Sequence, residues 1–299
     1  MVGSKDKLQF NMKKIYLLMM LLATVFVACS DDDDDNKKEG DNETPWEIKM
    51  TVKADADDAR FGVNSFSSDA IIESVNWGDG TTSDNCDKLH YYNKGEYTII
   101  IKGKGEIGLN CLSSFSEHAQ LISLDVTKCP TLTGLNCSDN LLTSLDLSKN
   151  PALIGLSCNN NQLTALDVSK CQALTRLECS YNQLTSLNVS NCTMLQVLGC
   201  DGNTLNSLDI SKNFELQSLG CSGCQLTSLD VSKNTKLVLL VCAKNNFDDD
   251  AMNAIYNGLP VREGSDNAAI TILSTDNQGN KTIAKNKNWK VEVLDIPIN

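Results

Sequence analysis

Apolar residues recur with a fixed period over the second half of the chain. From Leu132 onward, two leucine columns and one cysteine column return every 21 residues. The first column holds Leu132, Leu153, Leu174, Leu195, Leu216 and Leu237; the second holds Leu135, Leu156, Leu177, Leu198, Leu219 and Leu240; the third holds Cys137, Cys158, Cys179, Cys200, Cys221 and Cys242. The Leu-x-Cys alternation predicts a short strand whose leucine and cysteine side chains point inward.

A polar column follows the cysteines at the same period. It holds Asn140, Asn161, Asn182, Asn203, Cys224 and Asn245, and each complete unit closes with a segment such as LTSLDVSKN. One unit cannot bury its own leucines, but stacked units form a continuous core. Twenty-one residues leave little room for a helix, so the closing segment is predicted to be tight and mostly extended. The asparagines are expected to satisfy backbone groups at a buried turn.

The consensus L-x-x-L-x-C-x-x-N-x-L resembles a leucine-rich repeat, in particular the internalin type whose 21-residue unit carries a cysteine ladder. The resemblance covers residues 121–257 directly. It implies a solenoid with a parallel sheet on a concave face. Internalin-like proteins are bacterial surface adhesins, so the resemblance also implies binding of protein or glycan ligands. The repeat itself is scaffold, and no particular ligand is implied.

The sequence also contains a Cys-x-x-Cys pair, Cys221 and Cys224, a spacing typical of thiol redox centres and zinc sites. The repeat explains both residues differently, because Cys221 belongs to the cysteine column and Cys224 to the asparagine column. We therefore predict that the column cysteines are buried, inert free thiols, stacked at roughly the 4.8 Å spacing of neighbouring strands.

The repeats at 132–247 are flanked on the N-terminal side by a region of alternating strands at 46–106. Its Trp77-Gly-Asp-Gly80 turn and the stretch from His90 to Tyr97 resemble a PKD-type β-sandwich module. Residues 107–131 are expected to form the N-terminal cap of the solenoid. The resulting fold class is mainly β, with a small sandwich, a solenoid and an α/β cap.

The pattern changes after residue 247, and residues 248–299 are interpreted as an atypical last repeat and a C-terminal cap. The stretch DDDAMNAIYNGLP predicts a short helix, with Met252, Ile255 and Leu259 facing the core and with Gly258 and Pro260 ending it. The acids at 248–250 suit a helix N-terminus, and calcium binding there is an alternative that the sequence leaves open.

Residues 1–28 have the features of a secretory signal, with Lys13 and Lys14 followed by a 14-residue apolar run that is short for a membrane span. The run ends at Val27-Ala28-Cys29, which resembles a bacterial lipobox with Cys29 as the lipidated residue. The acidic linker at 29–45 resembles the export signal of surface lipoproteins. These features predict an outer-membrane lipoprotein that is held in the membrane through Cys29 and exposed at the cell surface.

Net charge and composition exclude several functions. The charge is −12 and the only basic cluster lies at the extreme N-terminus, which argues against nucleic-acid partners. The two histidines, His90 and His118, have no nucleophile nearby in the sequence, and no zinc spacing or phosphate loop is present. We therefore predict no enzymatic activity, no catalytic residue, no bound metal and no cofactor.

The candidate ligand-binding residues are the outward positions of the predicted strands. They are Asn136, Ser157, Arg176, Glu178, Tyr181, Val197, Val238, Leu239 and Val241. Arg176, Glu178 and Tyr181 form the bulkiest polar group, and Val238, Leu239 and Val241 are expected to approach an exposed apolar patch unless the cap covers them. The leading hypothesis is a non-enzymatic adhesin with protein ligands. A glycan-binding protein of a nutrient-uptake system and a structural envelope protein are the alternatives.

Overall fold

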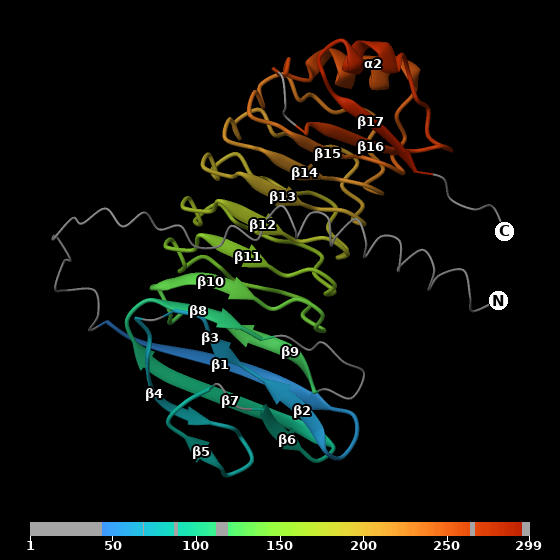
Figure 1. Ribbon diagram of the computed structural model, residues 1–299. Helices are drawn as coiled ribbons and strands as arrows, with labels where there is room; N and C mark the ends of the chain where they lie inside the picture. Colours follow the sequence, from blue (N-terminus) through green and yellow to red (C-terminus); the bar gives the residue numbers. More distant parts are fainter. Residues whose placement is uncertain (1–43, 68, 87–88, 112–118, 264–266, 295–299) are drawn as a thin grey trace, which may run out of the picture. The chain divides into compact units, whose positions relative to one another are not determined.

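The computed structural model describes residues 44–67, 69–86, 89–111, 119–263 and 267–294 (Figure 1). The predicted signal peptide, the lipidation site Cys29, the linker as far as residue 43, and His118 lie outside these ranges. All described residues belong to one compact unit with its own buried core.

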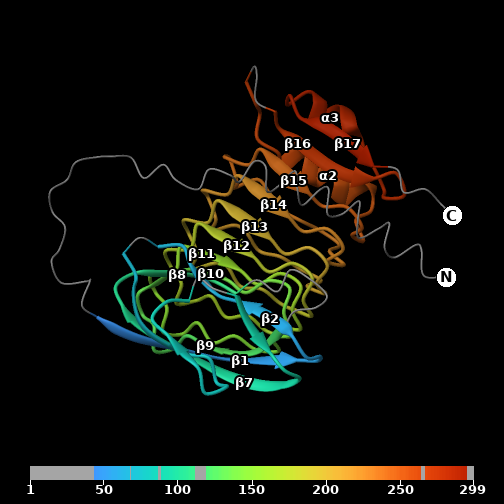
Figure 2. The same cartoon turned by 60° about the horizontal axis from the view of Figure 1, so that its bottom comes forward.

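One ten-stranded sheet runs through the repeats, with the strand order β17-β16-β15-β14-β13-β12-β11-β10-β8-β3. Its strands are parallel except β3, and they lie side by side in Figures 1 and 2. Their bounds are β3 (Asn64–Ser65), β8 (Ile107–Asn110), β10 (Leu132–Asn136), β11 (Gly155–Ser157), β12 (Arg176–Glu178), β13 (Val197–Gly199), β14 (Ser218–Gly220), β15 (Leu239–Val241), β16 (Ala269–Leu273) and β17 (Lys290–Leu294). From β11 to β15 each residue pairs with the one 21 positions later, so the sequence columns become physical columns.

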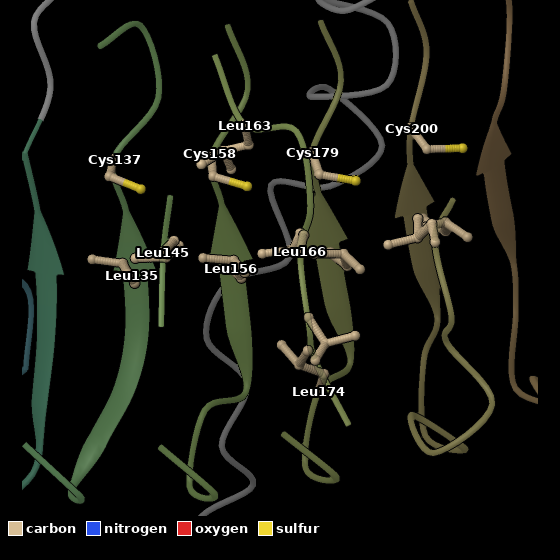
Figure 3. Packing of buried hydrophobic residues seen from close by; sticks show 14 of the residues in the cluster. Leu135, Cys137, Leu145, Leu156, Cys158, Leu163, Leu166, Leu174, Cys179 and Cys200 are labelled. Atoms are coloured by element: carbon tan, nitrogen blue, oxygen red, sulfur yellow. The ribbon is translucent and has the colours of Figure 1, made fainter. Parts of the chain in front are cut away.

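The leucine and cysteine columns form the core beneath this sheet. Every column residue is buried, and Figure 3 shows Cys137, Cys158, Cys179 and Cys200 in a row with their sulfur atoms pointing the same way. The six column cysteines are free and buried, which confirms the prediction. Burial raises the pKa of the Cys137 thiol to about 12, so it stays protonated and unreactive at neutral pH.

The cysteine ladder has a seventh member that the 21-residue period does not reveal. Cys111 follows β8 and is buried, and its N–H donates to Asn136 O at 2.7 Å. The spacing to Cys137 is 26 residues rather than 21, so the fixed period misses it. The signal was nevertheless present, because Gly-Leu-Asn-Cys occurs at both 108–111 and 134–137.

The side chains of the asparagine column form hydrogen bonds with buried backbone groups, as predicted, and these groups belong to successive repeats. Asn161 Nδ2 donates to the carbonyls of Cys137 at 3.0 Å and Cys158 at 3.1 Å, while its Oδ1 accepts from Leu142 N at 2.9 Å. Asn140, Asn182 and Asn203 repeat this arrangement. Each side chain therefore serves backbone groups of its own repeat and of the preceding one, where water cannot reach.

A second asparagine column uses its side chains differently. Asn150, Asn213 and Asn234 donate through Nδ2 to two carbonyls each, but their buried Oδ1 atoms have no hydrogen-bond partner among the described residues. In other repeats this column holds Cys129, Cys171 and Cys192, all buried. A thiol can replace asparagine here because only a donor is used.

The N-terminal region forms a five-stranded sheet, in the order β5-β4-β7-β1-β9, and a two-stranded sheet, β2-β6. The bounds are β1 (Pro45–Ala54), β2 (Ala59–Gly62), β4 (Ile71–Asn76), β5 (Thr82–Ser83), β6 (Leu89–Tyr92), β7 (Gly95–Lys104) and β9 (Gln120–Asp125). Strand pairing crosses the boundary expected at residue 106: β9 pairs with β1, and β3 pairs with β8 of the solenoid. Each region thereby covers a strand edge of the other, which would otherwise expose unpaired backbone groups.

The Trp-Gly-Asp-Gly stretch forms a tight turn at the end of β4. Gly78 and Gly80 have φ of 85° and 93°, values that favour glycine. The Trp77 and His90 rings stack with centroids 4.6 Å apart, and His90 Nε2 lies 2.7 Å from Asp79 Oδ2. Burial opposes ionisation of Asp79, but hydrogen bonds from Thr81 and His90 outweigh it and lower the pKa to about 2. His90 is thus held by neighbours within the module.

The C-terminal region contains α2 (Asp249–Gly258) and α3 (Lys281–Lys285) beside β16 and β17. Met252 and Ile255 of α2 are buried, as predicted. Asp248 caps α2, accepting from Ala251 N at 2.8 Å, and Asp249 accepts from Gly279 N at 3.2 Å. These two acids therefore hold backbone groups. Among the described residues, no three His, Cys, Asp or Glu side chains come together as a metal site.

Candidate functional site

The concave face consists of the outward side chains of β8 and β10–β15. One column contains Asn110, Asn136, Ser157, Glu178, Gly199 and Gly220; the next contains Gly108, Gly134, Gly155, Arg176, Val197 and Ser218. Because the strands are paired in register, these side chains are held by the ladder rather than by loops. The sheet therefore presents a fixed two-column surface.

The structure brings three predicted residues, Ser157, Arg176 and Glu178, into one network. Arg176 Nη2 lies 2.5 Å from Glu178 Oε1, and Ser157 Oγ donates to Glu178 Oε2 at 3.1 Å. Ser138 Oγ and Asn159 Nδ2 lie 3.0 and 3.2 Å from Ser157 Oγ. The two charged side chains are only 17% and 11% exposed, so their charges are largely satisfied by each other.

Tyr181 lies at the turn that follows β12 and packs on the next repeat. It has a positive φ of 55°, and a Cβ on Gly202 would lie 2.6 Å from the Tyr181 ring. The glycine at 202 therefore makes room for the tyrosine. The Tyr181 ring thus lies against this turn, whereas Arg176 and Glu178 contact each other, and Glu178 also contacts Ser157.

The predicted apolar patch at Val238, Leu239 and Val241 is not exposed. Leu239 and Val241 are only 7% and 3% exposed, and Val238 is half-buried. The prediction was wrong because the sheet does not end at β15: Leu239 and Val241 pair with Ala269 and Thr271 of β16. The patch lies inside the sheet, consistent with the alternative that the C-terminal cap covers it. Val197 remains half-buried on the open part of the face, next to Arg176.

Sequence reasoning missed one residue of this surface, Phe66. Its N–H donates to Gly108 O at 3.0 Å, and its ring occupies the space where a Cβ on Gly108 or Gly134 would lie. Phe66 is 58% exposed. Nothing in the repeat period points to a residue so far upstream, although the two glycines in successive outward positions were a signal that something packs on them.

Asp201 is a buried carboxyl at the turn after β13. Its Oδ1 accepts from Ser222 N at 2.8 Å, and Ser180 Oγ donates to its Oδ2 at 3.3 Å. Burial raises its pKa from 3.8 to about 6 despite these bonds. Asn159, at the same position two repeats earlier, accepts from Ser180 N at 2.7 Å in the same way without a charge.

We expect Asp201→Asn to stabilise the protein above pH 6. Because the folded-state pKa is raised, wild-type stability falls as pH increases from about 4 to about 6, by about 3 kcal/mol for a shift of this size. The variant should be more stable by up to that amount at pH 7.5, and the difference should shrink as the pH falls toward 4. Urea unfolding of both proteins across this range measures it.

Asp146→Asn is the matched control with the opposite sign. A hydrogen bond from the Ser148 backbone lowers the pKa of Asp146, so this variant should be the less stable one at neutral pH, with the difference fading in acid. If Asp201→Asn gave the same stability difference at pH 4.5 and pH 7.5, the buried charge would not be the cause.

Cys221 and Cys224 occupy the two columns that the sequence assigned to them. Cys224 Sγ donates to Cys200 O at 3.2 Å, but a thiol does not replace the Oδ1 acceptor of asparagine. The backbone departs from the repeat here. Asn206 and Gln225 have φ of 59° and 63°, and Leu205 O accepts from Ser207 N rather than from the following repeat. Cys224 thus interrupts the hydrogen bonding of the asparagine column, and Cys221 and Cys224 do not form a disulfide.

Cys224→Asn is therefore expected to raise the free energy of unfolding by about 1–2 kcal/mol, because it restores one buried acceptor and its donors. Chemical denaturation under reducing conditions measures the gain. Cys221→Ala is the control, since it removes a core sulfur without adding a hydrogen bond and should be destabilising. A Cys224→Asn protein no more stable than wild type would show that the local backbone has adapted to the thiol.

The parallel strands in 21-residue register, the buried leucines and the cysteine ladder define a leucine-rich-repeat solenoid, as the sequence predicted. The chain is similar to the functional domain of InlJ from Listeria monocytogenes, whose structure includes a cysteine ladder. The identity is 33%, the match covers 58% of this chain and 37% of that chain, and the TM-score is 0.50. The chain thus spans little more than a third of the InlJ chain.

A second solved structure, the leucine-rich repeat domain of APL1B, matches at 20% identity over 56% of each chain, with a TM-score of 0.38. No protein-family model matches the chain. No curated protein matches it either. Within the described ranges, no helix has the length and apolar character needed to cross a membrane.

Proposed function

We propose that this protein is a non-enzymatic surface lipoprotein that binds a protein ligand through its concave face. The observation that carries the proposal is the character of that face. Among the described residues of β8 and β10–β15, the charged side chains Arg176 and Glu178 bind each other. Val197 lies beside Arg176, and the exposed ring of Phe66 lies over Gly108 and Gly134 on the same face. Depletion of free charge with aromatic and aliphatic side chains present is typical of the centre of a protein interface.

The likeness to the InlJ domain supports a protein-interaction role for the repeats. Anchoring through Cys29, export to the outer-membrane surface and the PKD-like nature of residues 46–106 belong to the same proposal. The sequence around Cys29 and the acidic linker support the first two. The glycine turn at Gly78 and Gly80 and the stacked Trp77–His90 pair support the third.

The test is binding of a soluble form, from residue 44 onward, to an array carrying both extracellular proteins and glycans. Val197→Arg places a long cation on the concave face, whereas Thr185→Arg places the same side chain at an exposed position in a closing segment. A saturable protein signal that is lost only with Val197→Arg supports the proposal. A signal on glycans, or a protein signal that Val197→Arg leaves intact, contradicts it and favours glycan capture or a structural role.

A further inference from the structure

We propose that a slot above Gly155 binds one aromatic side chain of a protein ligand, between Phe66 and Arg176. This inference rests on the proposed function and adds the chemistry that the concave face would recognise. The slot is built by a residue from the N-terminal region and by three successive repeats, so it is specific to this chain rather than common to every repeat.

Phe66 forms the first wall. Its backbone is tied to β8 through Gly108 O, and its ring edge lies over two neighbouring strands. A Cβ on Gly108 would lie 2.2 Å from the ring, and one on Gly134 would lie 2.6 Å from it. These glycines therefore hold the ring down on the sheet. Phe66 is 58% exposed, so the ring is available to a ligand.

Gly155 forms the floor. It pairs with Gly134 on one side and with Arg176 on the other, so it lies between the strand covered by Phe66 and the strand that carries the arginine. A Cβ built on Gly155 meets no atom within 4 Å. The two flanking strands are about 9.6 Å apart, twice the strand spacing, which leaves room for one side chain between the walls.

Arg176 forms the second wall, and its partners hold it in place. Glu178 binds the guanidinium, and Ser157 donates to the other oxygen of the same carboxylate. Ile154, which immediately precedes β11, is 48% exposed. The slot is thus bounded by an aromatic ring on one side and, on the other, by a guanidinium that Glu178 holds.

Charge complementarity selects the occupant. A carboxylate entering the slot would approach Glu178, and a cation would approach Arg176. An uncharged aromatic ring avoids both penalties: it packs against the Phe66 ring, and its negative face suits the guanidinium. An aliphatic side chain would fill the space but would gain nothing from Arg176. The structure therefore favours tyrosine, tryptophan or phenylalanine from a protein ligand.

The experiment is saturation-transfer NMR on the soluble form, with N-acetyl-L-tyrosinamide and N-acetyl-L-tryptophanamide as probes. N-acetyl-L-leucinamide tests the aliphatic alternative, and methyl β-D-glucopyranoside tests a sugar. We expect transfer to the aromatic probes above that to the leucine probe. Gly155→Leu, which fills the slot, should weaken their binding about tenfold. Phe66→Ala, which removes the ring contact, should also weaken it about tenfold, equivalent to about 1.4 kcal/mol.

Tyr91→Ala is the control, because Tyr91 is also 58% exposed but lies on β6. It should leave the probe signals unchanged. Gly155→Leu should unfold at the wild-type temperature, since its Cβ meets nothing, so a lost signal cannot come from misfolding. The proposed aromatic slot would be contradicted if the aromatic signals survived Gly155→Leu, or if the leucine or sugar probe gave a stronger signal than the aromatic probes. Failure here with a protein signal still sensitive to Val197→Arg would leave the proposed function standing.

Discussion

Replacing Asn182 by cysteine should lower the free energy of unfolding by about 3 kcal/mol, because the thiol leaves buried backbone groups without partners. Asn182 Oδ1 accepts from Leu163 N at 3.0 Å, and Nδ2 donates to Cys158 O and Cys179 O, each at 3.0 Å. Cysteine keeps at most one weak donor and offers no comparable acceptor. Urea denaturation followed by circular dichroism measures the loss.

The same substitution in the other asparagine column is the control. Asn213 uses only Nδ2, and Cys129, Cys171 and Cys192 already occupy its column in other repeats. Asn213→Cys should therefore cost less than about 1 kcal/mol, within the range of mild substitutions. Equal losses for the two variants would mean that the acceptor role of the first column has no energetic importance.

Gly78→Ala should destabilise the N-terminal region by about 4 kcal/mol or more, the range reached by severe steric changes. An alanine Cβ would lie 2.5 Å from Thr98 O and 2.8 Å from Thr98 N, in a backbone conformation with φ of 85°. The clashing atoms belong to the backbone of β7, so no side-chain rotation relieves them. Trp77, the preceding residue, and Trp46 are both buried in this region, so tryptophan fluorescence during denaturation reports the change.

Gly80→Ala separates the clash from the backbone strain. Gly80 has a similar φ of 93°, but a Cβ there meets no atom within 4 Å. The expected cost is about 1–2 kcal/mol, that of a left-handed conformation alone. If both variants were destabilised equally, the contact with Thr98 would not explain the requirement for glycine at position 78.

The repeat core could be predicted from the sequence because its contacts are periodic. Leu135, Cys137 and Asn140 each have an equivalent 21 residues later, so one unit determines the environment of the next. The helix at 249–258 was also predictable, since its cap and its apolar spacing are local signals. These are the parts of the fold in which sequence distance and spatial distance go together.

The candidate surface was predictable only in part, because two of its determinants are long-range. Phe66 reaches the sheet through a strand that pairs across the expected domain boundary, and no local pattern encodes that pairing. Leu239 looks outward by the repeat frame, but its burial depends on β16, which lies about thirty residues later and outside the fixed period. Arg176 and Val197, in contrast, pair with each other in the 21-residue frame, so their places in the sheet follow from the repeat alone.

The thiol at position 224 also bears on how the solenoid unfolds. In a stacked array the coupling between neighbouring units decides how far an opening spreads. Elsewhere in the column, each asparagine side chain forms hydrogen bonds to the preceding repeat, both as donor and as acceptor. Cys224 keeps only the donor bond, and the backbone around it has a different conformation. The array is therefore least cooperative between the units centred on Asn203 and Cys224. We expect the C-terminal units to open there as a separate block, exchanging their amide hydrogens before the units on the N-terminal side do.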